Sequence, residues 1–193
     1  MTQTTEIIER VLYSPGILPV MSDQRLAPSA KWRDAPNWHE TIAARQAAWE
    51  AQGLRLGYSI WARQVHGDYV WVVDESDMGS GAYHDAEVEA DAIICPKPHP
   101  LMNLAIKAAD CPILGLHCRS TGAIGVVHAG VAGQRNGIIA TTVEKMVLHG
   151  ASRGDLEVFV GPFVSHHHYR HPHYGETVRF FRERACAYPR GDF

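Results

Sequence analysis

Short apolar runs separated by glycine or proline occupy the sequence from Leu56 to His128, and they constrain the fold more than any other feature. The runs are rich in Val, Ile and aromatic residues, which favour strands, and they are too short for ordinary helices. The run at 69–73 is apolar on both faces, so we interpret it as a central strand. The predicted strands of this region are residues 58–64, 69–73, 92–95, 101–106, 113–117 and 123–128.

Helical patterns flank this strand region. Asn37 and Glu40 have the spacing of a capping box ahead of an Ala-rich run at 41–52, and Gly53 ends the run, so we predict a helix there. Between Gly137 and Gly150, apolar residues recur at the spacing of a helix face. The remaining predicted elements are a short strand at 10–13, a helix between Gly137 and Gly150, a strand at 156–160 and a helix from about Glu176.

The order of these elements predicts an α/β (α+β) protein, with a mixed β-sheet and helices packed on its faces. The 193 residues have the length of one domain and contain no repeat or long linker, so we predict a single domain over 1–193. Its 46% hydrophobic and 20% charged residues exclude a disordered or coiled-coil chain.

Charge and apolar run length limit the classes of partner. A net charge of −3 gives no electrostatic reason to expect nucleic acid or a membrane surface. No apolar stretch is long enough for a membrane span, and acidic residues stand where a signal peptide would be basic. We therefore expect a cytoplasmic protein. Its cysteines lack the density of a disulfide scaffold, so we expect reduced thiols at Cys95, Cys111, Cys118 and Cys186.

Three segments place a reactive side chain at a predicted strand end beside glycine or proline. They contain His66 before Gly67, Cys111 before Pro112, and His128 shortly before Gly130. One thiolate and two imidazoles would leave the fourth tetrahedral position of Zn²⁺ open. The residues alone leave another interpretation open, in which the cysteine is a small core residue and the histidines are ordinary hydrogen-bonded groups.

Histidine is unusually frequent, with 12 residues, and part of this excess is concentrated after Gly161-Pro162. We interpret that cluster as an exposed loop, because adjacent histidines point in different directions and no acidic or thiol partner lies among them. A second metal site or a histidine-lined rim is the alternative. The cluster consists of His166, His167, His168, His171 and His173.

A set of short motifs, in a fixed order, carries a family resemblance. The motifs are Arg63-Gln64-Val65-His66-Gly67, Glu89-Ala90-Asp91-Ala92, Ala108-Ala109-Asp110-Cys111-Pro112, Val127-His128-Ala129-Gly130, and Gly161-Pro162 followed by Tyr169. Together they resemble the purine nucleoside phosphorylase family formerly called multicopper polyphenol oxidoreductases or laccase-domain proteins. The resemblance covers about residues 56–182. It implies a fold similar to the cysteine-hydrolase-like fold of that family.

The resemblance also implies chemistry. It assigns the ligands of a catalytic zinc ion to His66, Cys111 and His128. It implies phosphorolysis of adenosine, inosine, guanosine and methylthioadenosine to the free base and ribose 1-phosphate, with adenosine deamination as a second activity. The expected partners are therefore a small purine nucleoside and phosphate, with no nucleic acid and no membrane.

Further residues around these ligands are candidates for the site. Asp110 adjoins Cys111 and is predicted to orient a ligand or relay a proton. The alternative is that Asp110 only stabilises a turn between two strands. Gln64 alternates onto the same side as His66, which makes it a candidate for substrate binding. Tyr169 is a second such candidate, because the resemblance places its region near the mouth of the site.

Two departures from the family pattern stand out. Relatives usually read His-Ala-Gly-Trp followed by a basic residue and glycine, whereas Val131 and Ala132 follow His128-Ala129-Gly130 in this chain. Arg135 lies just beyond and is a candidate to replace the lost charge, although a shifted guanidinium is not equivalent. The chain is also short at its C-terminal end relative to the family.

Three alternatives to a zinc-dependent phosphorylase follow from the same residues. A copper-dependent polyphenol oxidase, with copper in place of zinc, would need further histidine pairs, and only His171 and His173 have that spacing. A metal-free hydrolase would use Cys111 as nucleophile and His128 as base. A non-catalytic relative would bind a ligand without converting it, and the missing aromatic-basic pair makes this alternative reasonable.

Overall fold

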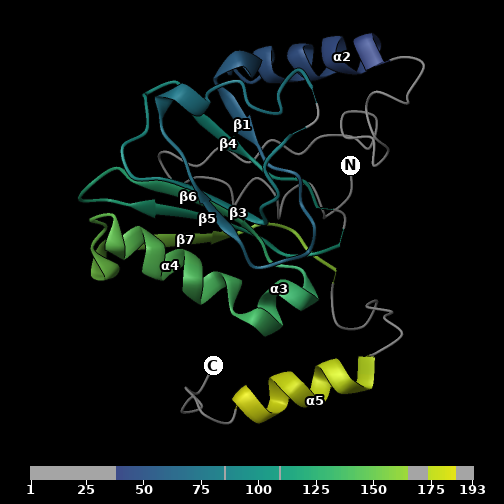
Figure 1. The fold of residues 1–193 in the computed structure, drawn as a ribbon, viewed down its shortest axis with the longest axis vertical. Helices are drawn as coiled ribbons and strands as arrows, with labels where there is room; N and C mark the ends of the chain where they lie inside the picture. Colours follow the sequence, from purple (N-terminus) through teal and green to yellow (C-terminus); the bar gives the residue numbers. More distant parts are fainter. Residues whose placement is uncertain (1–37, 85, 109, 165–173, 186–193) are drawn as a thin grey trace, which may run out of the picture.

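Two β-sheets form the framework of the computed structural model, which describes residues 38–84, 86–108, 110–164 and 174–185 (Figure 1). The larger sheet has the strand order β2-β3-β6-β5-β7. Its β2–β3 pair is parallel and its other pairs are antiparallel, so it is a mixed sheet. Its strands are β2 (Val70–Val72), β3 (Ala92–Cys95), β5 (Ile113–Cys118), β6 (Ile124–His128) and β7 (Leu156–Val160). The smaller sheet pairs β1 (Ser59–Trp61) in parallel with β4 (Asn103–Ala105).

Helices lie on both sides of this framework, as Figure 1 shows. The α4 helix runs along the larger sheet and contacts β2, β3 and β6, while α2 lies next to the smaller sheet. Gly137, in the left-handed region at φ 86°, separates α3 from α4. The described helices are α2 (Trp38–Glu50), α3 (Val131–Asn136), α4 (Ile138–Leu148) and α5 (Tyr174–Ala185), with short 3₁₀ turns at Leu56–Tyr58, Glu75–Asp77 and Arg153–Asp155.

Alternation along the strands divides the core between the two faces of the larger sheet. On one face, Ile94 and Leu116 pack with Ile138 and Met146 of α4. On the other face, Ile93 packs with residues that include Ile60 of β1 and Met102 beside β4. The larger sheet is therefore the middle layer, between α4 and the smaller sheet, and its strand ends are held from both sides.

The described structure confirms the predicted class and corrects details of the elements. The run at 69–73 was predicted as a central strand, and this is wrong: β2 is an edge strand of the larger sheet. It is apolar on both faces because Val70 and Val72 pack on the α4 side while Trp71 packs on the other. The sequence prediction also omitted α3. The strand predicted at 10–13 lies outside the described residues.

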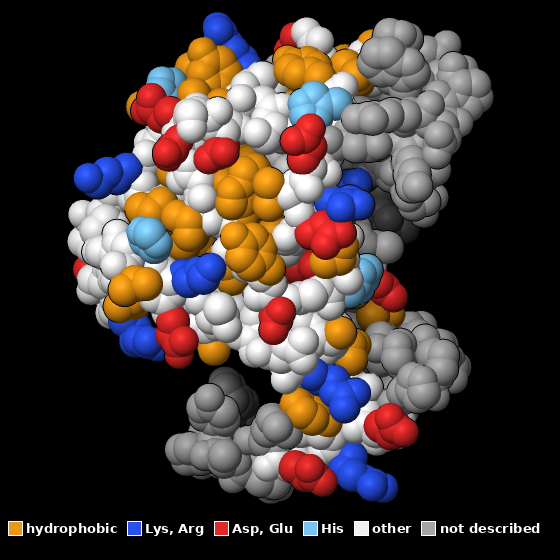
Figure 2. Space-filling model, viewed as in Figure 1, with side chains coloured by type: hydrophobic (Ala, Val, Ile, Leu, Met, Phe, Trp, Pro, Cys, Tyr) orange, Lys and Arg blue, Asp and Glu red, His pale blue; other side chains and the backbone are white. Residues whose placement is uncertain are grey.

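Two further observations concern the charges on the surface and the apolar character of the helices. On the face shown in Figure 2, acidic and basic side chains are interspersed among hydrophobic ones, over the described residues. Within the same part of the chain, no helix combines the length and the apolar character needed to cross a membrane.

Candidate metal centre

Three separate segments bring the predicted ligands together. His66 lies in the loop between β1 and β2, Cys111 lies just before β5, and His128 is the last residue of β6. The β5–β6 register pairs Ile113 with His128, which places Cys111 beside that histidine. The ligand atoms of His66, Cys111 and His128 all lie within 4.8 Å of one another.

The arrangement of the donors fits a zinc ion. Ligands at 2.0–2.3 Å in tetrahedral geometry are separated by about 3.3–3.8 Å, so donor atoms this close need only small movements to share one ion. The imidazoles of His66 and His128 meet edge to face, with ring centroids 4.8 Å apart. His128 is buried, Cys111 is half-buried and His66 is exposed. The set therefore opens to solvent on one side, as a catalytic site with a free coordination position requires.

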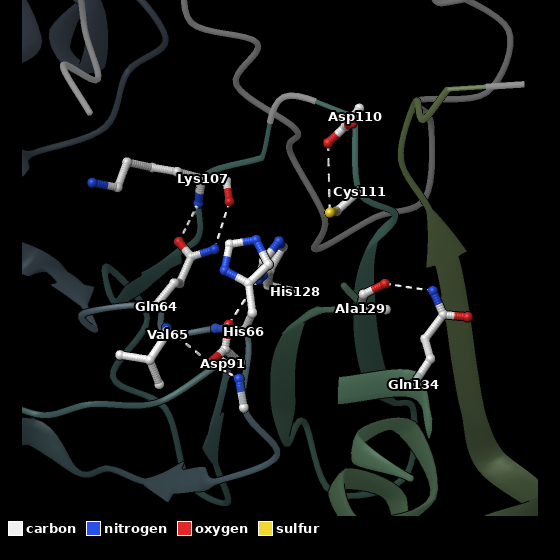
Figure 3. A network of polar contacts seen from close by, with 11 residues as sticks. Gln64, Val65, His66, Asp91, Lys107, Asp110, Cys111, His128, Ala129 and Gln134 are labelled. Atoms are coloured by element: carbon white, nitrogen blue, oxygen red, sulfur yellow. Dashed lines mark hydrogen bonds and ion pairs between the residues drawn. The ribbon is translucent and has the colours of Figure 1, made fainter. Parts of the chain in front are cut away.

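A buried carboxylate connects two of these segments (Figure 3). Asp91 accepts a hydrogen bond from His128 Nδ1 at 2.7 Å and others from the backbone N–H groups of Val65, His66 and Gly67 at 3.0, 3.1 and 2.8 Å. Burial by itself raises the pKa of Asp91, but the hydrogen bonds from His128, Gly67 and Val65 outweigh it and hold this pKa below its ordinary value. Asp91 is therefore a carboxylate at neutral pH.

The backbone around the ligands is tightly constrained. His66 has φ 60°, the one positive φ outside glycine among the described residues, and such a conformation costs about 1–3 kcal/mol. A Cβ at Gly130 would lie 3.0 Å from His66 Cδ2 and 3.7 Å from Cys111 Sγ. A Cβ at Gly133 would lie 2.6 Å from the carbonyl oxygen of Gly67, so α3 approaches the His66 loop as closely as only glycine allows.

Gln64 connects the His66 loop to the segment that leads to Cys111. Its Nε2 donates to the carbonyl oxygen of Lys107 at 2.6 Å, and its Oε1 accepts from the Lys107 N–H at 2.8 Å (Figure 3). Both polar atoms of the carboxamide are thus bonded to backbone. The prediction that Gln64 contacts substrate remains a prediction, and the structure gives this side chain a second role in holding the loop.

Cys111 and Asp110 are in contact. The Cys111 thiol donates a long hydrogen bond to Asp110 Oδ1, with 3.6 Å between the heavy atoms. Burial, together with the charges of Asp110 and Asp91, raises the pKa of Cys111 to about 11. In the metal-free chain the thiol is therefore protonated at neutral pH, and a nearby cation is needed to make it a thiolate.

The other predicted site residues lie apart from this contact network. Arg135 is exposed on α3, and its guanidinium lies over the ring of Phe180 at 5.0 Å from the centroid. Tyr169 and the histidine cluster lie outside the described residues.

Asp91 was part of the family motif, but no role was predicted for it. An acidic residue directly before the apolar run at 92–95 was the signal that could have indicated a buried carboxylate with partners.

Comparison with known proteins identifies the family. Residues 26–186 match the sequence profile of the family described as multi-copper polyphenol oxidoreductase laccase. The chain belongs to this laccase-type family. The matched range includes the segments that carry His66, Cys111 and His128, and the family resemblance that the motifs indicated is confirmed.

Curated relatives of the chain carry a different activity in their names. A purine nucleoside phosphorylase of Mycobacterium tuberculosis is 34% identical over 133 residues, which are 68% of this chain and 50% of the relative. A purine nucleoside phosphorylase of Streptomyces griseus is 35% identical over 123 residues, 63% of this chain and 47% of the relative. The chain therefore spans about half the length of these relatives.

Solved structures resemble the fold. The YfiH protein of Bacillus licheniformis superimposes with a TM-score of 0.66 at 26% identity, over 73% of this chain and 54% of that protein. A Neisseria meningitidis protein aligns over 90% of this chain and 64% of its own, with a TM-score of 0.63, but its 18% identity bears on the fold alone. These similarities support the mixed-sheet class.

Proposed function

We propose that this chain is a zinc-dependent purine nucleoside phosphorylase. It would convert adenosine, inosine, guanosine or methylthioadenosine and phosphate to the base and ribose 1-phosphate, with adenosine deamination as a second activity. The observation that carries the proposal is the convergence of His66, Cys111 and His128 at one solvent-accessible point. The names of the relatives supply the substrate class, and because the chain spans half their length, the whole activity is part of the proposal.

The chemistry divides between the ion and the side chains around it. A bound zinc ion would supply a Lewis acid at the open side of the donor set. Asp110 lies beside the Cys111 thiol and would accept its proton when the thiol becomes a ligand. Phosphate would need a cation near the sugar. Arg135 is our candidate for this role: it is exposed on the helix that follows His128, and its guanidinium lies over the Phe180 ring in the structure. Tyr169 and Gln64 remain candidates for contacts with the nucleoside.

The donor set favours phosphorylase chemistry over a copper oxidase. A trinuclear copper centre requires several more imidazoles than the pair at His66 and His128. Within the described residues, the cluster of His66, Cys111 and His128 is the one group of three or more His, Cys or acidic side chains that could hold a metal. Copper remains the alternative metal, and elemental analysis of protein purified without added metal distinguishes the two ions.

A metal-free cysteine hydrolase is less consistent with the site. A cysteine nucleophile needs a lowered pKa, whereas the pKa of Cys111 is raised to about 11 by burial and by carboxylates. The same high pKa suits a thiol that ionises only when a metal binds. The alternative of a non-catalytic, ligand-binding relative is tested by measuring whether the chain converts a nucleoside.

The deciding experiment is phosphorolysis by the zinc-loaded chain. Adenosine should yield adenine only when phosphate is present, and a Cys111→Ala variant should lose both the zinc and the turnover. Arg119→Ala, at an exposed position beyond β5, is the matched control and should keep both. Conversion that persists in Cys111→Ala, or in protein treated with a chelator, would exclude the proposed chemistry. Full zinc occupancy without conversion of any of the nucleosides would identify a non-catalytic relative.

A further inference from the structure

Asp91 is a charged residue at a place where a charge is costly. Its side chain has no solvent exposure, and a buried carboxylate is stable only when donors surround it. The donors come from two places, the His128 ring and the 65–67 backbone. We propose that Asp91 is a positioning residue that sets the geometry of both imidazole ligands. This inference rests on the metal site of the proposed function.

The two carboxylate oxygens of Asp91 accept hydrogen bonds from different donors, and this distribution indicates which nitrogen of His128 carries the proton. Oδ1 accepts from His128 Nδ1 at 2.7 Å and from the N–H of His66 at 3.1 Å, so one atom contacts both ligand residues. Oδ2 accepts from the N–H groups of Val65 and Gly67. Because an anionic oxygen only accepts, Nδ1 of His128 carries a proton, and Nε2 is the nitrogen left to bind a metal.

The same carboxylate holds His66 in its left-handed conformation. Three successive N–H groups can converge on one side chain only if the backbone between them is curved, and His66 at φ 60° provides this curvature. The cost of that conformation is offset by the three hydrogen bonds to a charged acceptor. Asp91 thus fixes one ligand through its ring and the other through its backbone.

The main chain of Asp91 is itself anchored independently of its carboxylate. Its N–H donates to the carbonyl oxygen of Tyr69 at 3.2 Å, and its own carbonyl oxygen accepts from the N–H of His128 at 2.7 Å. These bonds join β3 to its neighbours on either side and do not involve the side chain. A substitution at Asp91 can therefore change the ligand geometry while leaving the strand in place.

Asp91→Asn is the sharpest test, because it preserves shape and removes charge. Both oxygens of Asp91 face only donors, so the amide nitrogen of asparagine would oppose an N–H group in either orientation. We expect a 10–100-fold loss of Zn²⁺ affinity, measured by competition with a chromophoric chelator. We also expect an altered visible absorption spectrum for the Co²⁺-substituted protein, because the imidazoles no longer point at one centre.

Glu89→Gln is the matched control. Glu89 lies two residues before Asp91 and forms an exposed ion pair with Arg63 at 2.8 Å, so its loss removes a nearby charge without touching the ligands. This variant should bind Zn²⁺ like the wild type. Wild-type affinity and an unchanged Co²⁺ spectrum in Asp91→Asn would overturn the positioning role, even if its melting temperature fell. Absence of Zn²⁺ binding by the wild type would instead overturn the proposed metal site and the positioning role with it.

A measurement on the wild type covers the case in which Asp91→Asn does not fold. Nitrogen-15 NMR of the metal-free protein distinguishes the two neutral forms of the imidazole. We expect a proton on Nδ1 of His128. A neutral ring protonated on Nε2 alone would overturn the proposal without any substitution.

Discussion

Gln64 illustrates how a side chain predicted to face substrate can also support the site. Alternation along the chain predicted that Gln64 points to the side of His66 and Arg63 to the other side, and the Arg63 guanidinium pairs with Glu89 on the exposed surface. The sequence could not indicate that the carboxamide would meet the backbone of Lys107, a contact across 43 positions of the chain. The same limit applies to Asp91, whose partners lie 24 to 37 positions away. Distant hydrogen-bond partners depend on the tertiary fold, and no local pattern reports them.

Gln64→Glu should destabilise the protein, although it only replaces the side-chain NH2 group with an oxygen. The substituted carboxylate keeps the acceptor for the Lys107 N–H but places an oxygen where Nε2 now donates to the Lys107 carbonyl at 2.6 Å. The variant loses the hydrogen bond to the Lys107 carbonyl and brings a carboxylate oxygen against that carbonyl oxygen. The free energy of unfolding, measured by urea denaturation, should therefore fall by about 1–3 kcal/mol. Gln52→Glu, at an exposed position after α2, should change it by less than about 0.5 kcal/mol. Equal stability of the Gln64 and Gln52 variants would show that the paired bonds contribute nothing.

At the level of elements, the predicted strands and helices were mostly correct where the pattern was local. The β-branched runs and the helical spacing after Gly137 report structure directly, because burial of one face imposes the period. The prediction of β2 as a central strand was wrong, because an edge strand covered on both faces has the same apolar pattern as a central one. The α3 helix was omitted because Val131–Asn136 is too short to show a period.

Gly133 tests how closely α3 must approach the His66 loop. A methyl group there would lie 2.6 Å from the Gly67 carbonyl oxygen, which belongs to the backbone and cannot rotate away. Gly133→Ala should therefore lower the free energy of unfolding by about 1–3 kcal/mol and weaken Zn²⁺ binding, because the loop that carries His66 must shift.

Gly154→Ala is the control for this substitution, since a Cβ at Gly154 meets nothing within 4 Å. It should leave both the stability and the Zn²⁺ affinity close to those of the wild type. Wild-type behaviour of Gly133→Ala in urea denaturation and chelator competition would mean that the close approach is relaxed in solution.

For the whole molecule, the positions of the three proposed ligands would make metal binding a property of the complete fold. His66 depends on the β2–β3 pair, Cys111 precedes β5, and His128 ends β6. The sequence motifs predicted these residues as ligands through a family resemblance, whereas spacing alone favoured a core cysteine and ordinary hydrogen-bonded histidines. Their proximity required the register of four strands, β2, β3, β5 and β6, which is a global result of folding.

Zinc should therefore raise the melting temperature of the wild type. A ligand that binds only the folded state at 100 times its Kd stabilises by about 2.7 kcal/mol, which corresponds to about 5–10 °C for a chain of this length. Scanning calorimetry with zinc and then with excess chelator measures the shift. His66→Ala should abolish it, whereas His149→Ala, at the exposed end of α4, should retain it. A shift of equal size in the His66→Ala protein would place the bound zinc elsewhere.

The strand register also has a consequence for how the donor set is assembled as the chain is synthesised. Cys111 and His128 meet through β5 and β6, which are consecutive strands, so their encounter closes a short loop. His66 reaches them only after β3 pairs with β6, where Ala92 opposes Val127. Its segment emerges from the ribosome well before that partner exists. Until residue 128 has been made, the nascent chain holds a histidine without a coordination site, and the complete donor set arises only when the centre of the larger sheet forms.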